Sequence, residues 1–464
     1  MAIWHPRLAG RHGPKYLQIV EALADDVASG ALPAGTRLPP HRALAHALGV
    51  SPHTASRAYA EAVARALIRG EVGRGSFVRG PGRRAAGGSA GDLRRPDDGP
   101  VDLARNLPCV GLAETALADT LRALGAGAGL AALTDSQSAA DIRHHAEAAV
   151  AWLGRAGVSA GGDAVVATTG AQHGILCALM AATQPGDLLL TEALCYAPVR
   201  AMAARLALRL KPVEIDDEGL CPDALEAVCR GHRAAALYVA PTLHTPTTAT
   251  MGPARRARIA AIAARYGVTL IEDDVFGPLK PDRPAPLATL APERCFYVTS
   301  TSKCLAPGLR VGFVRAPAGQ AGALRHAVGL TSWMTPPLMV EIVARWIADG
   351  TAERLTEAQR RHAARRQALA GRLLEGAERR ADPHGLHLWL GLPQGWSAEG
   401  FAAEADRRGV RLVAGTAFAV DAAARPAAVR LCLSHEADEA RVRRGLETVR
   451  AMLREGPDAA ALVL

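Results

Sequence analysis

The stretch CFYVTSTSKCLAPGLRVG (residues 295–312) joins a short apolar run to a polar turn that contains glycine. Its first six residues are mostly apolar without a regular polar alternation, which is typical of a strand buried on both faces of a parallel sheet. Longer helical stretches separate similar runs. These other runs occupy residues 164–169, 187–192, 235–241 and 268–274. From about residue 160 onward we therefore predict an α/β fold, with a parallel sheet covered by helices.

Polar or glycine-containing groups follow four of these runs. Open α/β sheets bind ligands beyond the carboxyl ends of their strands. We therefore expect these groups to form one site. They are Gly170-Ala171-Gln172, Thr242-Leu243-His244-Thr245, Asp273-Asp274 and Ser300-Thr301-Ser302-Lys303.

Lysine is rare in this chain, which has four lysines against fifty arginines. A retained lysine indicates a need for an amine, because a guanidinium cannot form a Schiff base. Lys303 stands between two serines and Arg310, which can together hold a phosphate. Backbone N–H groups at residues 170–172 can add to this clamp. Asp273 can keep a pyridine nitrogen protonated. Amine, phosphate clamp and carboxylate together predict pyridoxal 5'-phosphate as cofactor.

The segments TTGAQHGI, APTLHTPTTATM, LIEDDVFGPL, STSKCLAPGLRVGF and VRLCLS resemble the aminotransferase-like domain of fold-type-I pyridoxal-phosphate proteins. The resemblance implies that Lys303 binds the cofactor covalently and that Asp273 contacts the ring nitrogen. It implies that Tyr196 stacks on the ring and that Arg430 binds the α-carboxylate of an amino acid. The groups that it implies at the phosphate are Ala171, Gln172, Ser300, Ser302 and Arg310.

Each of these residues also has a simpler interpretation. Lys303 could be a solvated surface residue, and Asp273 could cap a turn while Asp274 takes the ring nitrogen. Tyr196 could be part of the core, and Arg430 could form a surface ion pair. His173 and His244 are interpreted as packing or orienting residues rather than as acids or bases.

The chain departs from the resembled pattern around the cofactor ring. Thr245-Pro246-Thr247-Thr248 replaces a loop that usually offers an asparagine, although Thr245 can replace one hydrogen bond. Phe276 replaces a tyrosine that usually donates to the same ring oxygen, and residues 133–139 replace a stretch that usually contains Tyr-Gln. Lost donors raise the pKa of the Schiff base, at about 1.4 kcal/mol per pKa unit. The sequence therefore favours ligand sensing over fast transamination.

The N-terminal region is basic. Its first hundred residues carry +6 of the chain's net +9, which predicts contact with a polyanion. Helical apolar spacing predicts a helix over 15–29 and another over 41–48, ended by Gly49. Ser51 is a good N-cap and Pro52 suits the first position of a third helix. This pattern predicts a helix-turn-helix, and EVGRGSFV (71–78) adds a hairpin with a cation at its tip.

Residues 32–78 resemble the DNA-binding domain of GntR transcription factors, and the two resemblances together identify the chain as similar to the MocR subfamily. In this subfamily a winged helix-turn-helix is fused to an aminotransferase-like domain. Members often carry arginine where this chain has Pro52, so base preference at that position is not transferable. The residues that the resemblance implies at DNA are Arg42, Pro52, His53, Thr54, Ser56, Arg57 and Arg74.

We expect a DNA-binding domain over residues 1–79, a linker rich in glycine, proline and charge over 80–100, and an effector domain over 101–464. Within the effector domain, we expect a large subdomain at about 160–315 and a smaller α+β subdomain at about 316–464. The resemblance also implies a homodimer whose two DNA-binding domains contact two half-sites.

The composition excludes several classes of protein. The sequence has no apolar run of about 18 residues and no signal-peptide pattern. The eight cysteines are scattered, without CxxC or zinc-ligand spacing, so we expect no metal site. We expect a soluble cytoplasmic protein that has no membrane partner.

Three functions fit the sequence. The first is a transcriptional regulator that binds an operator in double-stranded DNA and senses an amine or amino acid through pyridoxal phosphate. The second is an active aminotransferase with an appended DNA-binding domain. The third is a regulator whose large domain has lost its cofactor.

Overall fold

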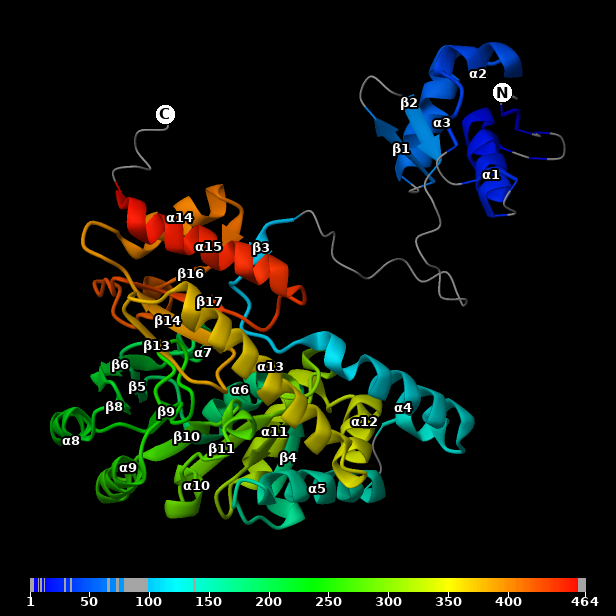
Figure 1. Cartoon of the computed structure of the whole chain (residues 1–464). Helices are drawn as coiled ribbons and strands as arrows, with labels where there is room; N and C mark the ends of the chain where they lie inside the picture. Colours follow the sequence, from blue (N-terminus) through cyan, green and yellow to red (C-terminus); the bar gives the residue numbers. More distant parts are fainter. Residues whose placement is uncertain are drawn as a thin grey trace. The chain divides into compact units, whose positions relative to one another are not determined.

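The protein is described by a computed structural model that covers residues 4–6, 8, 11, 13–28, 31–33, 36–64, 67–71, 75–78, 99–136 and 139–457. The chain divides into two compact units, residues 1–95 and 96–464 (Figure 1). Most of the expected linker and the expected wing residue Arg74 lie outside the described residues.

The first unit is a small helical domain with a hairpin. Its core combines apolar side chains from all three helices and both strands, among them Val20, Leu44, Tyr59, Ile68 and Val78. The strands pair in antiparallel register. The elements are α1 (Lys15–Ala28), α2 (His41–Leu48), α3 (Pro52–Ala64), β1 (Ile68–Glu71) and β2 (Gly75–Val78).

The turn between α2 and α3 has the geometry that the sequence predicts. Gly49 has a φ of 63°, in the left-handed region that favours glycine, and ends α2. The Ser51 Oγ accepts a hydrogen bond of 3.1 Å from the backbone N–H of Thr54, and α3 begins at Pro52. The predicted helix-turn-helix is therefore confirmed.

The second unit contains a large mixed sheet, in the order β4-β12-β11-β10-β9-β5-β6 along the described part of the chain. All five apolar runs predicted as strands are strands of this sheet. The strands are β4 (Val165–Thr168), β5 (Leu188–Glu192), β6 (Arg209–Val213), β9 (Ala236–Val239), β10 (Thr269–Asp273), β11 (Cys295–Ser300) and β12 (Gly312–Arg315).

The expectation of a wholly parallel sheet is wrong at one strand. β12 runs antiparallel to both β11 and β4. It follows β11 after a short turn that contains η5 (Thr301–Lys303) and η6 (Pro307–Leu309), which is too short for a helical crossover. Because of this reversal, Lys303 and Arg310 both lie near the carboxyl end of β11.

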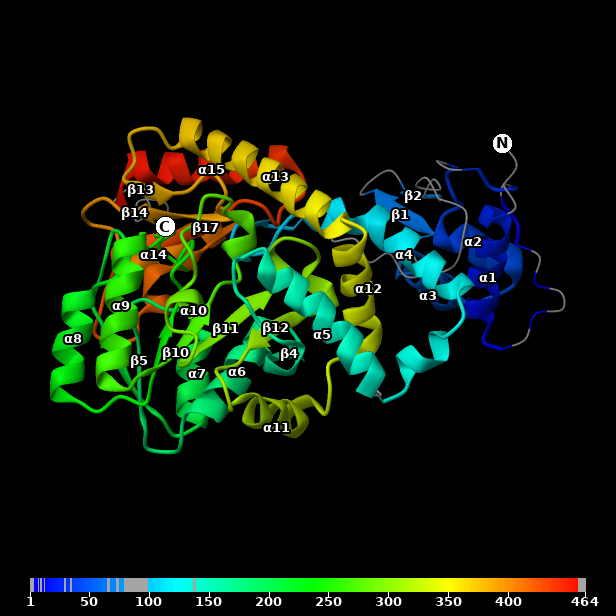
Figure 2. The ribbon, with the colours of Figure 1, turned by 90° about the horizontal axis from the view of Figure 1, so that it is seen from below.

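Helices cover both faces of the large sheet (Figure 2). On one face lie α6 (Ala171–Ala182), α7 (Pro198–Arg205) and α11 (Ala321–Ser332). On the other lie α5 (Ala139–Gly154), α8 (Pro222–Gly231), α9 (Pro253–Tyr266), α10 (Leu287–Leu290) and α12 (Pro337–Ala348). The boundary expected near residue 315 thus precedes α11 and α12, which still pack on the large sheet.

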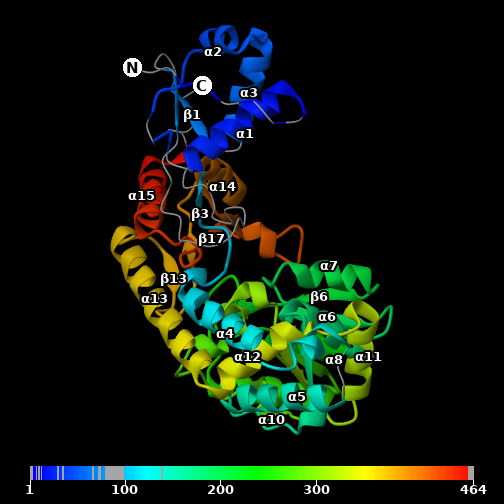
Figure 3. The same cartoon turned by 90° about the vertical axis from the view of Figure 1, so that its right-hand side faces the viewer.

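A smaller sheet, in the order β13-β14-β17-β16 among the described residues, forms a separate core with α13, α14 and α15. Figure 3 shows α14 and α15 beside β17, apart from the helices of the large sheet. β3 (Val101–Asp102) pairs in parallel with β15 (Val410–Arg411), so the first residues of the unit belong to this part. The other bounds are β13 (Arg379–Ala381), β14 (His387–Gly391), β16 (Val413–Ala414), β17 (Ala428–Cys432), α13 (Thr351–Leu373), α14 (Ala398–Arg407) and α15 (Glu439–Glu455).

Short elements complete the described chain. They are α4 (Glu114–Ala126), β7 (Ile215–Asp216), β8 (Gly219–Leu220), η1 (Val110–Ala113), η2 (Leu130–Thr134), η3 (Gly162–Ala164), η4 (Gly277–Leu279) and η7 (Gly415–Phe418). No helix in the described ranges has the length and apolar character needed to cross a bilayer.

Candidate functional site

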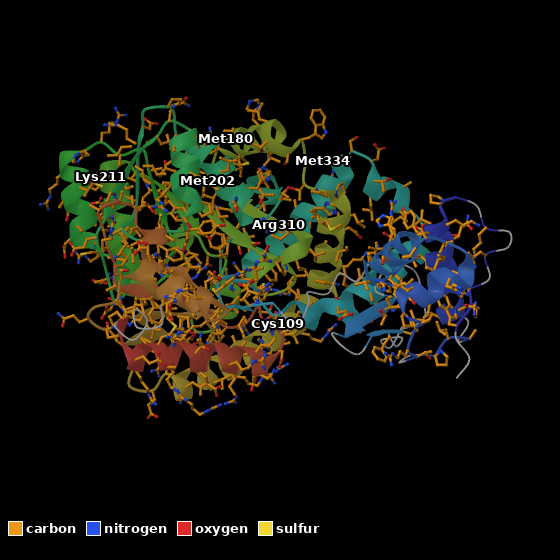
Figure 4. All side chains as sticks on the ribbon, turned by 90° about the horizontal axis from the view of Figure 1, so that it is seen from above. Cys109, Met180, Met202, Lys211, Arg310 and Met334 are labelled. Carbon is orange, nitrogen blue, oxygen red and sulfur yellow. The ribbon has the colours of Figure 1, made fainter. Side chains whose placement is uncertain are left out.

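A cavity of about 180 Å³ lies where strands of the large sheet end. Apart from Gly170, every residue that the sequence analysis proposed for the cofactor or for the α-carboxylate lines it. They come from the ends of β10 and β11, the start of α6, the turn that contains η5 and η6, two loops and β17 of the small sheet. Figure 4 labels one of them, Arg310.

Lys303 points its amine into the cavity. The Nζ donates a hydrogen bond of 2.5 Å to the backbone oxygen of Asn106 and lies 5.2 Å from the centre of the Phe276 ring. Burial, aided by the nearby Arg430 cation, lowers the pKa of Lys303 to about 8. At neutral pH roughly a tenth of this amine is therefore unprotonated and nucleophilic, far more than for an exposed lysine.

Asp273 ends β10 with only 7% of its surface exposed. Its Oδ2 accepts a hydrogen bond of 2.7 Å from the hydroxyl of Tyr238 on β9. Burial raises the pKa of Asp273 to about 6, while the Tyr238 hydrogen bond opposes that shift. A buried carboxylate of this kind is stabilised by a cationic partner, such as a protonated ring nitrogen.

Asp274, the alternative to Asp273, is engaged elsewhere. It pairs with Arg283 and accepts a hydrogen bond of 2.6 Å from the hydroxyl of Tyr297. It does not line the cavity. The geometry therefore favours Asp273 as the group that faces a bound ring.

The expected phosphate end is compact. Ser300 Oγ donates to the Val311 carbonyl at 3.0 Å and accepts from the backbone N–H of Ser302 at 3.1 Å. Arg310 has a φ of 52°, and its guanidinium donates to the Thr169 carbonyl at 3.4 Å. A Cβ added to Gly170 would lie 2.6 Å from this guanidinium. Gly170 therefore leaves the space in which Arg310 reaches the N-terminus of α6.

Four more predicted residues complete the cavity wall. The Tyr196 hydroxyl donates to Oε1 of Gln172 at 3.1 Å, which links the expected ring-stacking residue to the start of α6. The Thr245 Oγ1 is buried and has no hydrogen-bond partner among the described residues, so it is available to a ligand. Ala171 lines the cavity at the first position of α6.

Arg430 lies on β17 and is 8% exposed. Its Nη2 donates to the backbone oxygen of Ala104 at 2.8 Å, and its guanidinium lies 4.8 Å from the centre of the Phe418 ring. Within the described part of the chain no carboxylate forms an ion pair with it. A buried cation that has only neutral partners is a natural receptor for an anionic ligand.

Sequence reasoning missed three residues at this site. Tyr238 and Asn106 line the cavity, and His387 lies 3.1 Å from the Asn106 amide, measured from Nδ1 to Nδ2. The polar hydroxyl of Tyr238 within the predicted strand 235–241 was a usable signal. Asn106 and His387 belong to no motif, and only the tertiary fold brings Asn106 across 197 residues to Lys303.

These residues fit pyridoxal phosphate. The cavity offers a buried amine for the aldehyde, a carboxylate for the ring nitrogen and a serine–arginine cluster beside a helix N-terminus for the phosphate. The unpartnered hydroxyl of Thr245 fits a polar ring substituent. The ring of Phe276 offers no hydrogen bond to such a substituent.

In the first unit, the residues expected at DNA lie on α2 and at the start of α3. Arg42, Pro52, His53, Ser56 and Arg57 are exposed and Thr54 is half-buried. Neighbouring elements hold two of these side chains. The Arg57 guanidinium lies 3.9 Å from the Tyr16 ring centre and donates to its hydroxyl at 3.2 Å, whereas the Ser56 Oγ lies 3.1 Å from the His41 Nδ1.

Comparison with known proteins gives a family for the first unit and relatives for the whole chain. Residues 15–78 match the family described as bacterial regulatory proteins, gntR family. The whole chain is similar to the uncharacterized HTH-type transcriptional regulator YdeF of Bacillus subtilis, with 27% identity over 97% of this chain and 96% of YdeF. It is 28% identical to the vitamin B6 salvage pathway transcriptional repressor PtsJ of Salmonella typhimurium, over 86% of this chain and 94% of PtsJ.

The second unit is similar to solved aminotransferases. The alpha-aminoadipate aminotransferase LysN of Thermus thermophilus, complexed with N-(5'-phosphopyridoxyl)-L-leucine, superposes with a TM-score of 0.69 and 25% identity. That match covers 79% of this chain and 94% of LysN. The fold is therefore that of an aminotransferase, joined in one chain to a DNA-binding domain.

Proposed function

Because this chain belongs to the MocR subfamily, GntR-type transcriptional regulators with an aminotransferase-like domain, we propose that its second unit is the sensor that controls DNA binding by the first. The sensor holds pyridoxal phosphate on Lys303 and responds to an amine or amino acid that reaches the same cavity. The observation that carries this proposal is the convergence of Lys303, Asp273, Arg310 and Arg430 on one cavity.

The chain's own residues support a division of labour in this cavity. Arg310 and the serines hold the phosphate, Asp273 holds the proton on the ring nitrogen and Tyr196 packs on the ring. When bound, pyridoxal phosphate would supply an aldehyde with which amines condense reversibly, and a ring that withdraws electrons. Arg430 binds the carboxylate of an amino-acid ligand, which favours amino acids over simple amines.

Operator affinity of the full chain tests this proposal. A DNA duplex selected in vitro with the parent protein serves as the probe, and affinity is measured without cofactor, with pyridoxal phosphate, and with added amino acids. We expect the affinity to change on adding an amino acid to the loaded protein, and the change to vanish in Lys303→Ala. Equal affinities of the parent protein in all states would contradict sensing.

A second candidate is catalysis of amino-group exchange, which the aminotransferase fold and the depressed pKa of Lys303 favour. Phe276 counts against it, because it leaves the ring oxygen without one hydrogen-bond donor. Multiple-turnover formation of a new amino acid from a keto acid, lost in Lys303→Ala, would establish an enzyme. We expect turnover to be slow or undetectable.

The homodimer and its two half-sites remain part of the proposal. A duplex that carries two half-sites should bind one dimer, whereas a single half-site should bind more weakly. Analytical ultracentrifugation with each duplex measures both quantities.

A further inference from the structure

Residues 99–109, here called the strap, are the first described residues after the segment that joins the two units. The strap is tied to the small sheet and its helices at both ends. Arg441 donates to the carbonyls of Gly99 and Pro100, at 2.9 and 3.1 Å. At the other end, Cys109 exchanges two backbone hydrogen bonds with the side chain of Gln359, at 3.1 and 2.7 Å.

Between these ends the strap crosses the cavity. Its Ala104 carbonyl accepts from Arg430 at 2.8 Å, and its Asn106 carbonyl accepts from the Lys303 amine at 2.5 Å. The Asn106 amide lies 3.1 Å from His387, which fixes the residue that presents this carbonyl. The strap thus contacts the two cations that the proposed function assigns to the cofactor and to the carboxylate.

Cofactor attachment competes with one of these hydrogen bonds. A free lysine ammonium has three N–H donors, and one of them is aimed at the Asn106 carbonyl. When the amine condenses with an aldehyde, one water leaves and the nitrogen keeps at most one N–H. Directing that nitrogen at the aldehyde carbon takes it away from the strap, so the Asn106 carbonyl loses its partner.

We propose that Asn106 is a positioning residue for Lys303 in the cofactor-free protein, and that loading of the cavity releases the strap. The inference rests on the proposed function, because it needs Lys303 as the point of attachment. It goes further in naming the moving segment. The released part is the middle of the strap, residues 104–107, because β3 keeps Val101 and Asp102 paired with β15 and Arg441 holds Gly99 and Pro100.

Hydrogen–deuterium exchange of the full-length protein tests release. Amide exchange in peptides within residues 103–109 is compared before and after pyridoxal phosphate loading, with loading verified by borohydride trapping and mass spectrometry. We expect at least a severalfold faster exchange in the loaded protein. Unchanged exchange with a trapped adduct present would overturn this inference alone. Absence of any adduct would overturn the proposed function and this inference with it.

Two neighbouring variants provide a second test, which depends on whether the affinity for pyridoxal phosphate rises or falls. Asn106→Ala removes the anchor to His387, whereas Arg105→Ala removes a side chain that is 60% exposed and pairs only locally with Asp102. If the strap competes with the cofactor, Asn106→Ala should bind pyridoxal phosphate about fivefold more tightly, since one buried hydrogen bond is worth roughly that factor. Arg105→Ala should match the parent.

A merely structural role for Asn106 predicts the opposite sign. If the strap only builds the wall of the site, Asn106→Ala should bind pyridoxal phosphate more weakly, and that result would overturn the inference. Circular dichroism of both variants shows whether they fold. Should Asn106→Ala not fold, the exchange experiment on the parent protein decides the question without it.

Discussion

At the scale of single residues, the site consists of charges whose burial shifts their protonation toward the proposed chemistry. Burial brings the pKa of Lys303 down to about 8 and that of Asp273 up to about 6. Between those two pH values Asp273 is mostly ionised, and the neutral fraction of Lys303 grows with pH. Near neutral pH the cavity therefore offers both a carboxylate and a partly free amine.

The rate of pyridoxal phosphate attachment should follow the titration of Lys303. Because only the neutral amine attacks an aldehyde, the rate should rise with pH and level off above about pH 8. Arg430→Gln removes a cation that lowers the pKa of Lys303, so its profile should shift to higher pH. Stopped-flow absorbance measures both profiles, with the exposed Arg425→Gln as control. An unshifted profile would show that the two groups are not coupled.

Affinity for pyridoxal phosphate should depend on Asp273 at lower pH. Asp273 must be ionised to pair with the ring nitrogen, so affinity should fall by roughly tenfold per pH unit below about pH 6. Tyr238 donates to this carboxylate and lowers its pKa. In Tyr238→Phe the fall should therefore begin at higher pH. Fluorescence titration measures the shift, and an identical profile for both proteins would refute it.

At the scale of elements, two glycines with a positive φ differ in the space that surrounds them. Gly170 and Gly186 have φ values of 79° and 89°, but only Gly170 faces a close neighbour, the Arg310 guanidinium. Gly170→Ala should lower pyridoxal phosphate affinity by about tenfold or more, because it displaces Arg310 from the phosphate end. Gly186→Ala also places a side chain at a positive φ but should keep the affinity. Equal losses in both variants would mean that backbone strain is the cause.

The recognition helix α3 is the second element that makes a specific prediction. Tyr16 on α1 holds Arg57 by a ring contact and a hydrogen bond. Tyr16→Ala should weaken binding to a selected DNA duplex by about two- to fivefold, as expected for a cation–π contact. Tyr16→Phe keeps the ring and should lose less. Fluorescence anisotropy measures the affinities, and Tyr16→Ala should have no further effect in an Arg57→Ala background.

The sequence predicted elements best where one local pattern decided them. Buried strands such as β11 appear as continuous apolar runs, and Gly49, Ser51 and Pro52 mark the turn before α3. The sequence did not predict the elements whose presence or direction depends on tertiary contacts. The direction of β12 depends on a short return turn, and β6 lies at a sheet edge without a continuous apolar run.

At the scale of the whole molecule, the site likewise contains residues that local patterns identify and residues that only tertiary contacts bring together. Motifs located Lys303, Asp273 and Arg310, because each sits in a dense local pattern of strand end, glycine and polar residues. Asn106 and His387 could not be found, since their importance comes only from distant chain segments that meet. The account of the strap therefore depends on the structure, whereas the account of the cofactor rests on sequence and structure together.

Both proposals require that Lys303 binds pyridoxal phosphate covalently within the full-length regulator. Borohydride reduction of the loaded protein, followed by peptide mass spectrometry, tests it most directly. We expect a phosphopyridoxyl adduct on the peptide that contains Lys303, together with loss of the near-visible absorbance. An adduct confined to Lys15, Lys211 or Lys280, or no adduct after full reconstitution, would contradict it.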